Sequence, residues 1–213
     1  MSASTLIHLP MIHIEKFSLS QGYNVLFKNF NFDIYYNEIV GFYAPTGSGK
    51  TSLLNLIAGL ELSSDFIKDG IITIEPGLKI SYVFQEPRLI ENTSVLKNVM
   101  LPLLNIYDKD QAKKKAEYYL QKLELGTKIN QMAKNLSGGE KQRVALARAF
   151  AYPGRLMLLD EPFHSQDEAK KNKLIAETLK LIHEEERTCI IVSHDKDELK
   201  AMNARIMTDK EFK

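Results

Sequence analysis

Apolar residues at the start of the chain have the spacing of β-strands. In residues 30–34, Phe-Asn-Phe-Asp-Ile, apolar and polar positions alternate, as in a strand with one face in water. Residues 12–19 indicate another extended segment, and Gly-Tyr-Asn at 22–24 indicates a turn between the two. Residues 38–43 form a mostly apolar run, which is typical of a buried strand. We therefore predict an N-terminal antiparallel β-subdomain followed by a core strand.

The next stretch contains one helix and two strands. Residues 52–58 have helical spacing, which stops at Gly59. Residues 70–74 and 80–84 are rich in β-branched and aromatic residues and flank a Pro-Gly turn at 76–77. These features predict a short helix after the core strand and then two further strands.

The pattern becomes helical from about Arg88 onwards. A short helix is predicted to begin at residues 93–94, Thr-Ser, and to end at Pro102. A longer one begins near Asp110 and has apolar residues at helical spacing, with Gly126 beyond its end. This region is therefore predicted to be a helical subdomain.

The last part of the chain returns to buried strands. Residues 155–161 and 190–193 are continuous apolar runs, which favour strands of a parallel sheet buried on both faces. Asp167 is predicted to cap the helix between them, and a last strand lies around Ile206. The whole pattern predicts one α/β domain with a mostly parallel sheet, in which residues 1–87 and 152–213 form the core and residues 88–151 form the inserted helical subdomain.

Composition restricts the classes of protein to which the chain can belong. Its 213 residues are 44% hydrophobic and 26% charged, as in ordinary soluble domains, and a net charge of +1 gives no reason to expect nucleic acid as a partner. The single cysteine, Cys189, reads as a small buried residue. The start of the chain lacks the layout of a signal peptide, and its longest apolar run, residues 99–104, is too short to span a bilayer. We therefore expect a cytoplasmic protein.

Residues 44–51, Ala-Pro-Thr-Gly-Ser-Gly-Lys-Thr, predict a phosphate-binding loop between a strand and a helix. Glycine lets the backbone turn N–H groups inward, and the helix start adds partial positive charge. Lys50 is expected to reach the terminal phosphates and the Thr51 hydroxyl to bind Mg²⁺. Ala44 stands where glycine is usual, so a strained start of the loop is possible. The predicted ATP-binding residues are Tyr23, Ala44, Pro45, Thr46, Gly47, Ser48, Gly49, Lys50, Thr51 and Ser52.

Polar side chains are predicted at the ends of buried strands. Asp160 and Glu161 end the run 155–161, His194 follows the strand 190–193, and Gln85 follows the strand 80–84. Ligands in open α/β sheets bind at the carboxyl ends of strands. We expect Asp160 to hold Mg²⁺, Glu161 to act as the base that polarises the attacking water, and Gln85 to extend toward a metal-bound water.

Two further features concern the base of the nucleotide and a helix start. Tyr23 could be a platform on which adenine stacks, or it could be an ordinary tyrosine at the edge of a strand; Phe17 is the competing candidate. In Leu-Ser-Gly-Gly-Glu at 136–140, Ser137 and Glu140 have the spacing of a capping box for a helix that runs to about Ala151. Two glycines weaken such a helix start by roughly 1 kcal/mol each, which makes sense if bare N–H groups must approach an anion.

Taken together, these motifs resemble the nucleotide-binding subunit of ABC transporters over essentially the whole chain. They are the phosphate loop, Gln85, the run Leu-Ser-Gly-Gly-Glu-Lys-Gln at 136–142, the strand that ends in Asp160 and Glu161, and His194, in the family's order. Residues 84–89, Phe-Gln-Glu-Pro-Arg-Leu, look like the run found in the nitrate, sulfonate and taurine importer group.

The resemblance implies two ATP molecules with Mg²⁺ in a head-to-tail dimer with a second copy or a homologous ATPase. Each nucleotide on one subunit would be closed over by residues of the other, namely Ser137, Gly138, Gly139 and Glu140. It also implies that Glu161 is the catalytic base, His194 the sensor of the γ-phosphate, and Asp167 a contact for communication across the dimer. Gln85 would link the site to the helical subdomain, which binds a membrane permease; an importer would also use a solute-binding protein. The subunit would then sit at the inner face of the membrane through the permease.

One segment departs from the family, and other functions remain open. Residues 163–167, Phe-His-Ser-Gln-Asp, differ from the family's usual Ser-Ala-Leu-Asp, which bears on communication across the dimer. One alternative is a soluble ABC-type ATPase in DNA repair or translation, although the chain has no coiled-coil insertion or second cassette. The other is a regulatory module that binds ATP without hydrolysing it, against which the retained Lys50, Asp160, Glu161 and His194 argue.

Overall fold

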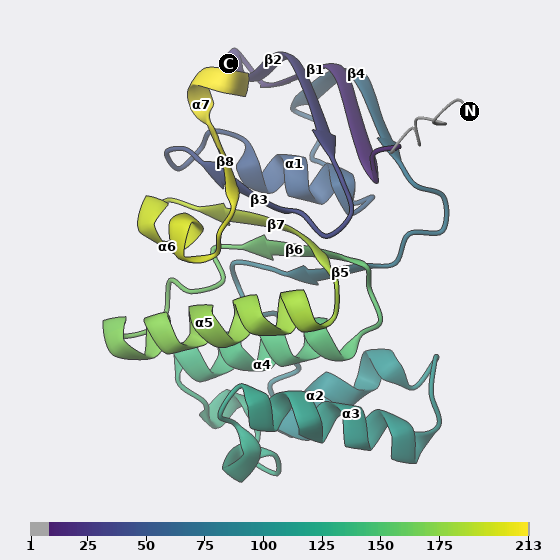
Figure 1. Cartoon of the computed structure of the whole chain (residues 1–213), viewed down its shortest axis with the longest axis vertical. Helices are drawn as coiled ribbons and strands as arrows, with labels where there is room; N and C mark the ends of the chain where they lie inside the picture. The colour runs from purple at the N-terminus through teal and green to yellow at the C-terminus, as the bar shows by residue number, and fades with distance from the viewer. Residues whose placement is uncertain (1–8, 213) are drawn as a thin grey trace, which may run out of the picture.

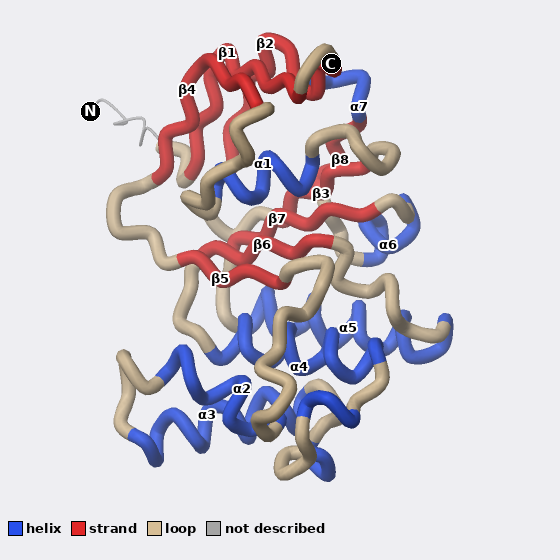
Figure 2. The backbone as a smooth tube through the Cα atoms, turned by 180° about the vertical axis from the view of Figure 1, so that it is seen from behind, coloured by secondary structure: helices blue, strands red, loops and turns tan. Residues whose placement is uncertain are grey.

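The fold consists of two sheets with a helix between them (Figure 1, Figure 2). A computed structural model describes residues 9–212. The smaller sheet is antiparallel, in the order β2 (Asn24–Ile34), β1 (Ile12–Gln21), β4 (Phe66–Ile74). The larger is parallel, in the order β5 (Ile80–Val83), β6 (Leu156–Asp160), β7 (Thr188–Ser193), β3 (Ile39–Tyr43), β8 (Arg205–Thr208). The predicted α/β class with a parallel core sheet and an antiparallel β-subdomain is confirmed.

Helices cover both faces of the parallel sheet (Figure 1). On one side, α1 (Lys50–Ile57) lies between the two sheets, and on the other lie α4 (Gly138–Ala151) and α5 (Glu168–Glu184). The side chains of β6 alternate accordingly: Leu156 and Leu158 pack in the core on the α1 side, and Met157 and Leu159 in the core on the α4 side. Burial on both faces explains why the strand is continuously apolar.

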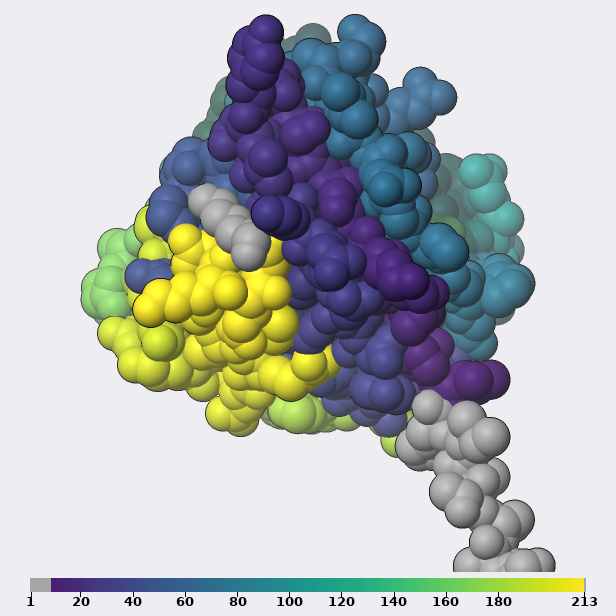
Figure 3. All heavy atoms as spheres, turned by 90° about the horizontal axis from the view of Figure 1, so that it is seen from above, coloured from purple at the N-terminus to yellow at the C-terminus, as the bar shows by residue number. Residues whose placement is uncertain are grey.

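Phenylalanine side chains from β2, β3 and α7 pack together in one core. The rings of Phe27 and Phe212 stack at 4.8 Å, and Phe30 and Phe42 lie around them. Phe212 belongs to α7 (Asp209–Phe212), so the C-terminal residues close this core; Figure 3 shows them in yellow against the strands of the small sheet.

Two strands of the small sheet are longer than predicted. β2 begins at Asn24 rather than at residue 30, and β4 at Phe66 rather than at residue 70. Irregular pairing interrupts β1 opposite both points, and Asn29 and Gly70 have positive φ. A Cβ on Gly70 would lie 2.4 Å from the carbonyl oxygen of Lys16, so glycine allows a close approach of two strands there. The regular alternation begins only after these irregular points, so it predicts strands shorter than those in the structure.

The segment 88–151 contains helices and turns. They are α2 (Val95–Met100), α3 (Lys109–Lys122) and α4, with short 3₁₀ turns at Leu101–Leu103, Gly126–Lys128 and Ala133–Asn135. Pro102 lies in the first of these turns, directly after α2, as the helix-ending role predicts. α4 packs against α2 and α3 and also against β5, so it joins the helical segment to the sheet. The division into a core and an inserted subdomain at residues 88 and 151 stays a prediction.

Other parts of the chain also bear on the predictions from the pattern. α3 begins at Lys109 with Asp108 as its cap, in agreement with a predicted start near Asp110, and Asp167 caps α5 as predicted. The short helices α6 (Lys196–Ala201) and α7 were not predicted. Cys189 is fully buried. Residues 1–8, on which the statement about a signal peptide rests, lie outside the described residues. None of the helices between residues 9 and 212 has both the length and the apolar character that a membrane span needs.

Candidate nucleotide-binding site

Three neighbouring strands bring the predicted site residues to one edge of the parallel sheet. Asp160 is the last residue of β6, His194 follows β7, and the loop after Tyr43 follows β3. Because β6, β7 and β3 are adjacent and parallel, their carboxyl ends lie at the same edge. The topology therefore joins residues that are far apart in sequence.

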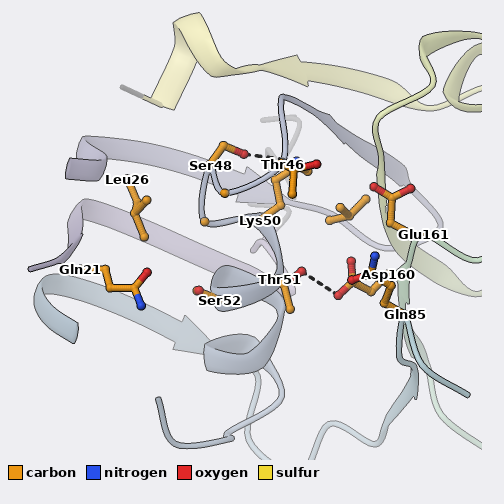
Figure 4. Close-up of a pocket in the computed structure, with 13 residues that line it drawn as sticks. Gln21, Leu26, Thr46, Ser48, Lys50, Thr51, Ser52, Gln85, Asp160 and Glu161 are labelled. Carbon is orange, nitrogen blue, oxygen red and sulfur yellow. Dashed lines mark hydrogen bonds between the residues drawn. The ribbon is translucent and has the colours of Figure 1, made fainter. Parts of the chain in front are cut away.

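A pocket at this edge contains most of the predicted residues (Figure 4). Gln21 and Leu26 from the small sheet point into it from one side, and Asp160, Glu161 and Gln85 lie on the other side. The lining residues are Gln21, Leu26, Thr46, Gly47, Ser48, Gly49, Lys50, Thr51, Ser52, Gln85, Asp160, Glu161 and Val192. The pocket thus has an end with acidic residues and an end next to the β-subdomain, with the phosphate loop between them.

The loop 44–51 owes its shape to two glycines. Gly47 and Gly49 have φ of 79° and 92°, in the left-handed region that favours glycine. A Cβ on Gly49 would also lie 2.9 Å from the Cβ of Leu26 in β2, so the loop packs directly on the small sheet. Ala44 is buried and its φ is not positive. The possible strain at Ala44 is therefore absent, because this position does not need the conformations that only glycine allows.

Lys50 is buried and its ammonium group lies under the loop. It donates hydrogen bonds to the carbonyl oxygens of Ala44, at 2.6 Å, and Pro45, at 2.8 Å, and to the Ser48 hydroxyl at 3.2 Å. The amine thus holds the turn of the loop together from inside. The same position, at the first residue of α1, suits an ammonium group that contacts an anion bound by the loop.

Asp160 and Thr51 form a pair of oxygen groups beside the loop. The Thr51 hydroxyl donates to Oδ2 of Asp160 at 2.8 Å, and the other carboxylate oxygen, Oδ1, is buried without a hydrogen-bond partner among the described residues. Burial raises the pKa of Asp160, and the hydrogen bond from Thr51 opposes this shift. A buried carboxylate oxygen without a partner next to a hydroxyl fits a hard cation such as Mg²⁺. Among residues 9–212 no group of three or more His, Cys, Asp or Glu side chains is arranged to hold a metal ion.

Glu161 is held in a strained backbone conformation by two neighbours. Its φ is 48°, unusual for a residue with a side chain, and its N–H donates to the carbonyl oxygen of Val192 at 3.0 Å. Its own carbonyl oxygen accepts from Nδ1 of His164 at 2.7 Å. Oε2 of its carboxylate lies 2.7 Å from Nδ1 of His194, so the two residues at the ends of β6 and β7 are in direct contact. The arrangement fixes a carboxylate at the pocket wall.

The signature turn 136–140 has the predicted capping box but lies outside this pocket. The Ser137 hydroxyl accepts from the Glu140 N–H at 3.3 Å, and the Glu140 carboxylate accepts from the Ser137 N–H at 3.0 Å. Glu140 also pairs with Lys128. Ser137 and Gly138 are exposed. The start of α4 is therefore capped and accessible, and it does not line the pocket of its own chain.

α4 also supports the loop that carries Gln85. The guanidinium of Arg148 donates to the carbonyl oxygens of Arg88, at 3.0 Å, and Pro87, at 2.7 Å. Gln85 itself is exposed and lines the pocket close to Asp160 (Figure 4). The Gln85 loop is therefore attached to the same helix that begins at the signature turn.

The end of the pocket next to the β-subdomain differs from the expectation. Phe17 is 2% exposed in the core, so its candidacy as a base platform was wrong. Tyr23 is fully exposed at the β1–β2 turn and does not line the pocket, so the lining gives its stacking role no support. Gln21 and Leu26 line this end instead, and the Gln21 amide donates to Asp65 at 2.9 Å. The sequence predicts the turn at 22–24, but it does not indicate that Gln21, just before this turn, lines the pocket.

The comparison with known families agrees with this geometry. A family model described as ABC transporter matches residues 27–164, which is more than half of the chain. The chain belongs to the ABC transporter family. The resemblance seen in the motifs is thereby confirmed, and as a member the chain is an ATP-binding protein and an ATP hydrolase.

Individual relatives of this ABC ATPase extend the match along the chain. The nitrate transport protein NasD of Klebsiella oxytoca is 30% identical over 93% of the chain and 79% of its own length. The sulfate/thiosulfate import ATP-binding protein CysA 1 of Shewanella oneidensis is 36% identical over 83% of the chain, which spans 50% of that relative. Among solved structures, a dimeric post-hydrolysis state of the ATP-binding cassette MJ0796 bound to ADP and Pi has a TM-score of 0.82 and 29% identity, and covers 95% of this chain and 97% of that one.

Proposed function

We propose that two copies of this ABC ATPase, or one copy and a homologous subunit, close head-to-tail over two ATP molecules and so drive import through a separate membrane permease. The observation that carries this proposal is the division of the machinery within one chain. The phosphate loop, Asp160 and Glu161 share one pocket, whereas Ser137 and Gly138 stand exposed elsewhere. A second subunit would supply this turn to the open side of the pocket. The dimeric state of the similar MJ0796 cassette supports the same arrangement.

In the proposed complex, the loop residues bind the nucleotide through its phosphates. Lys50 and the first N–H groups of α1 neutralise the terminal phosphates. Thr51 and Asp160 would hold Mg²⁺, with Gln85 reaching toward its water; when bound, the ion neutralises the charge that develops on the phosphate oxygens. The N–H groups of Ser137, Gly138 and Gly139 from the partner, with Glu140 holding their turn, would close over the γ-phosphate. ADP lacks that phosphate, so closure depends on ATP.

Glu161 is the proposed general base. Its carboxylate accepts a proton from the attacking water as the new oxygen–phosphorus bond forms, and the bond to ADP breaks. His194 orients this carboxylate through its Nδ1, and its role as sensor of the γ-phosphate would require the closed, ATP-bound dimer. Asp167, at the start of α5, is the proposed contact for communication across the dimer. Release of phosphate removes the anion that the clamp holds and lets the dimer open.

The transport assignment rests on the named functions of the relatives. NasD is named as a nitrate transport protein and CysA 1 as a sulfate/thiosulfate import protein, which favours import over DNA repair or translation. The helical segment 88–151 is the proposed docking region for the permease, and a solute-binding protein would deliver the solute outside. This places the subunit on the cytoplasmic face of the membrane, attached through the permease.

The direct test measures ATP hydrolysis and self-association of the purified chain and of Glu161→Gln. We expect the variant to bind ATP but to hydrolyse it slower by roughly 100-fold or more, because it lacks the base. In sedimentation experiments Glu161→Gln should form a dimer with Mg²⁺ and ATP and remain monomeric with Mg²⁺ and ADP. Lys50→Ala should abolish ATP binding.

The matched control is Glu117→Gln, the same chemical change at a half-buried residue of α3 that does not line the pocket. It should hydrolyse ATP and sediment like the wild type. A Glu161→Gln protein that stays monomeric when saturated with Mg²⁺ and ATP would contradict closure of the dimer. Equal rates of hydrolysis in wild type and Glu161→Gln would instead contradict the role of Glu161 and leave the dimer standing.

A further inference from the structure

The segment that departs from the family's usual sequence joins the catalytic strand to α5. It runs from Phe163, which is fully buried, to Asp167, which caps α5. At its start the His164 ring donates to the carbonyl oxygen of Glu161 at 2.7 Å. Because a carbonyl oxygen only accepts, Nδ1 of His164 carries the proton in this contact. The segment therefore begins at the backbone of the proposed base.

Its other end is attached to the start of α4 by Gln166. The side-chain amide donates from Nε2 to the carbonyl oxygen of Gly139 at 2.8 Å, and its Oε1 accepts from the guanidinium of Arg143 at 3.1 Å. Gly139 and Arg143 are four residues apart and so lie on one face of the helix. Both halves of the amide are used, and the partners fix its orientation, since the carbonyl can only accept and the guanidinium can only donate.

The backbones of the two elements are also in close contact at this point. A Cβ on Gly139 would lie 2.7 Å from the carbonyl oxygen of Ser165 and 2.8 Å from Nε2 of Gln166. On the preceding residue, Gly138, it would meet Ser165 at 3.8 Å, an ordinary contact distance. The signature turn therefore needs glycine at 139 to pack against residues 165–166 of its own chain, independently of any nucleotide.

We propose that Gln166 is a positioning residue that fixes the signature turn of α4 to the loop following Glu161. This inference rests on the proposed dimer, in which a subunit presents its signature turn to the partner's nucleotide while its Glu161 serves its own. Gln166 holds the signature turn and the loop after Glu161 in a fixed relative position within one subunit. Closure of the signature turn over the partner's nucleotide and alignment of Glu161 at the subunit's own nucleotide therefore occur together. A leucine, the family's usual residue before this aspartate, could not make either hydrogen bond.

The test uses the Glu161→Gln background, in which the ATP-bound dimer accumulates. Gln166→Leu removes both hydrogen bonds at similar volume, and Gln166→Glu keeps the acceptor for Arg143 but loses the donor to Gly139. The matched control is Gln131→Leu, because Gln131 donates from its amide to the carbonyl oxygen of Asn135 at 3.3 Å, away from the pocket. For each protein one measures the dimer dissociation constant with Mg²⁺ and ATP, the ATP affinity of the monomer, and the urea midpoint of unfolding.

We expect Gln166→Leu to weaken the dimer by roughly 10- to 100-fold, the effect of losing two hydrogen bonds of which one is charged. Gln166→Glu should fall between Gln166→Leu and the parent, and Gln131→Leu should match the parent. Because Gln166 does not line the pocket, the ATP affinity of the monomer should change less than about twofold.

Equal dimer affinity in Gln166→Leu and the parent would overturn the proposal. So would a loss of monomer ATP affinity and stability in step with dimer affinity, since that pattern indicates a structural role alone. A parent that stays monomeric would refute the proposed dimer itself, and the positioning role with it.

Discussion

His194 and Glu161 are in contact across two adjacent strands, with Nδ1 of the imidazole 2.7 Å from Oε2 of the carboxylate. Glu161 is 9% exposed, whereas the side chain of His194 is 63% exposed. A nearly buried carboxylate is thus in contact with a largely exposed imidazole ring. This geometry suits a histidine that orients the base and does not itself carry the reaction.

His194→Ala should therefore lower the turnover number and leave binding nearly intact. We expect turnover to fall by roughly 100-fold or more, because an unoriented carboxylate loses most of the benefit of a positioned base. The ATP dissociation constant should change by less than about threefold, since His194 does not line the pocket. Steady-state hydrolysis and equilibrium ATP binding check the two parts separately. His183→Ala, at an exposed histidine of α5, is the control and should behave like the wild type.

The two signature glycines should respond oppositely to alanine. At Gly138 an added Cβ has room, and alanine is favoured over glycine in helices by about 1 kcal/mol, so Gly138→Ala should preserve or raise stability. At Gly139 the Cβ would meet a backbone oxygen at 2.7 Å, which a side-chain rotation cannot relieve. Gly139→Ala should therefore destabilise the chain by about 1–3 kcal/mol despite the gain in helix propensity. Urea unfolding without nucleotide measures both; equal stability of the two variants would contradict the close packing on Ser165.

These examples show which parts of the site could be predicted from sequence. Local patterns located the phosphate loop, the capping box of Ser137 and the carboxylates at the end of β6, because each depends on residues close together in the chain. The side-chain contact between Gln166 and Gly139 depends on how a loop and a helix meet in space. The positions of Gln166 and Gly139 in the sequence do not predict this contact. The inward direction of Gln21 likewise depends on the register of two strands with bulges.

Glu140 should make the stability of the signature turn depend on pH. The hydrogen bond from Lys128 holds the pKa of Glu140 below its ordinary value of 4.5, and the N–H of Ser137 acts in the same direction. The unfolded chain therefore binds this proton more readily than the folded one, so the stabilisation is complete above pH 4.5 and is lost as pH falls through the lowered pKa.

Glu140→Gln should then cost about 0.5–1 kcal/mol near neutral pH, a modest value because Lys128 is partly exposed and screened by solvent. The free energy of unfolding of wild type and variant should converge as pH is lowered below 4.5. Glu117→Gln, which removes the exposed pair with Lys113, is the control and should cost less than about 0.5 kcal/mol. A difference that grows toward acid pH would contradict the assigned sign.

A substitution at Gln21, but not one at Tyr23, should change the affinity of the pocket for ATP. None of the described residues that line the pocket is aromatic, and Gln21 projects into it from the end of β1 (Figure 4). Gln21→Tyr would place a ring where the base is expected, and stacking on one ring contributes about 1–3 kcal/mol. ATP should then bind roughly 5- to 10-fold more tightly, which is the lower part of that range.

Tyr23→Ala should change the ATP dissociation constant by less than about twofold, because Tyr23 is fully exposed outside the pocket. Calorimetric titration with ATP and with inorganic tripolyphosphate checks the cause, since the gain in Gln21→Tyr should appear for ATP alone. A tenfold loss of ATP affinity in Tyr23→Ala, with tripolyphosphate binding unchanged, would instead put the base on Tyr23.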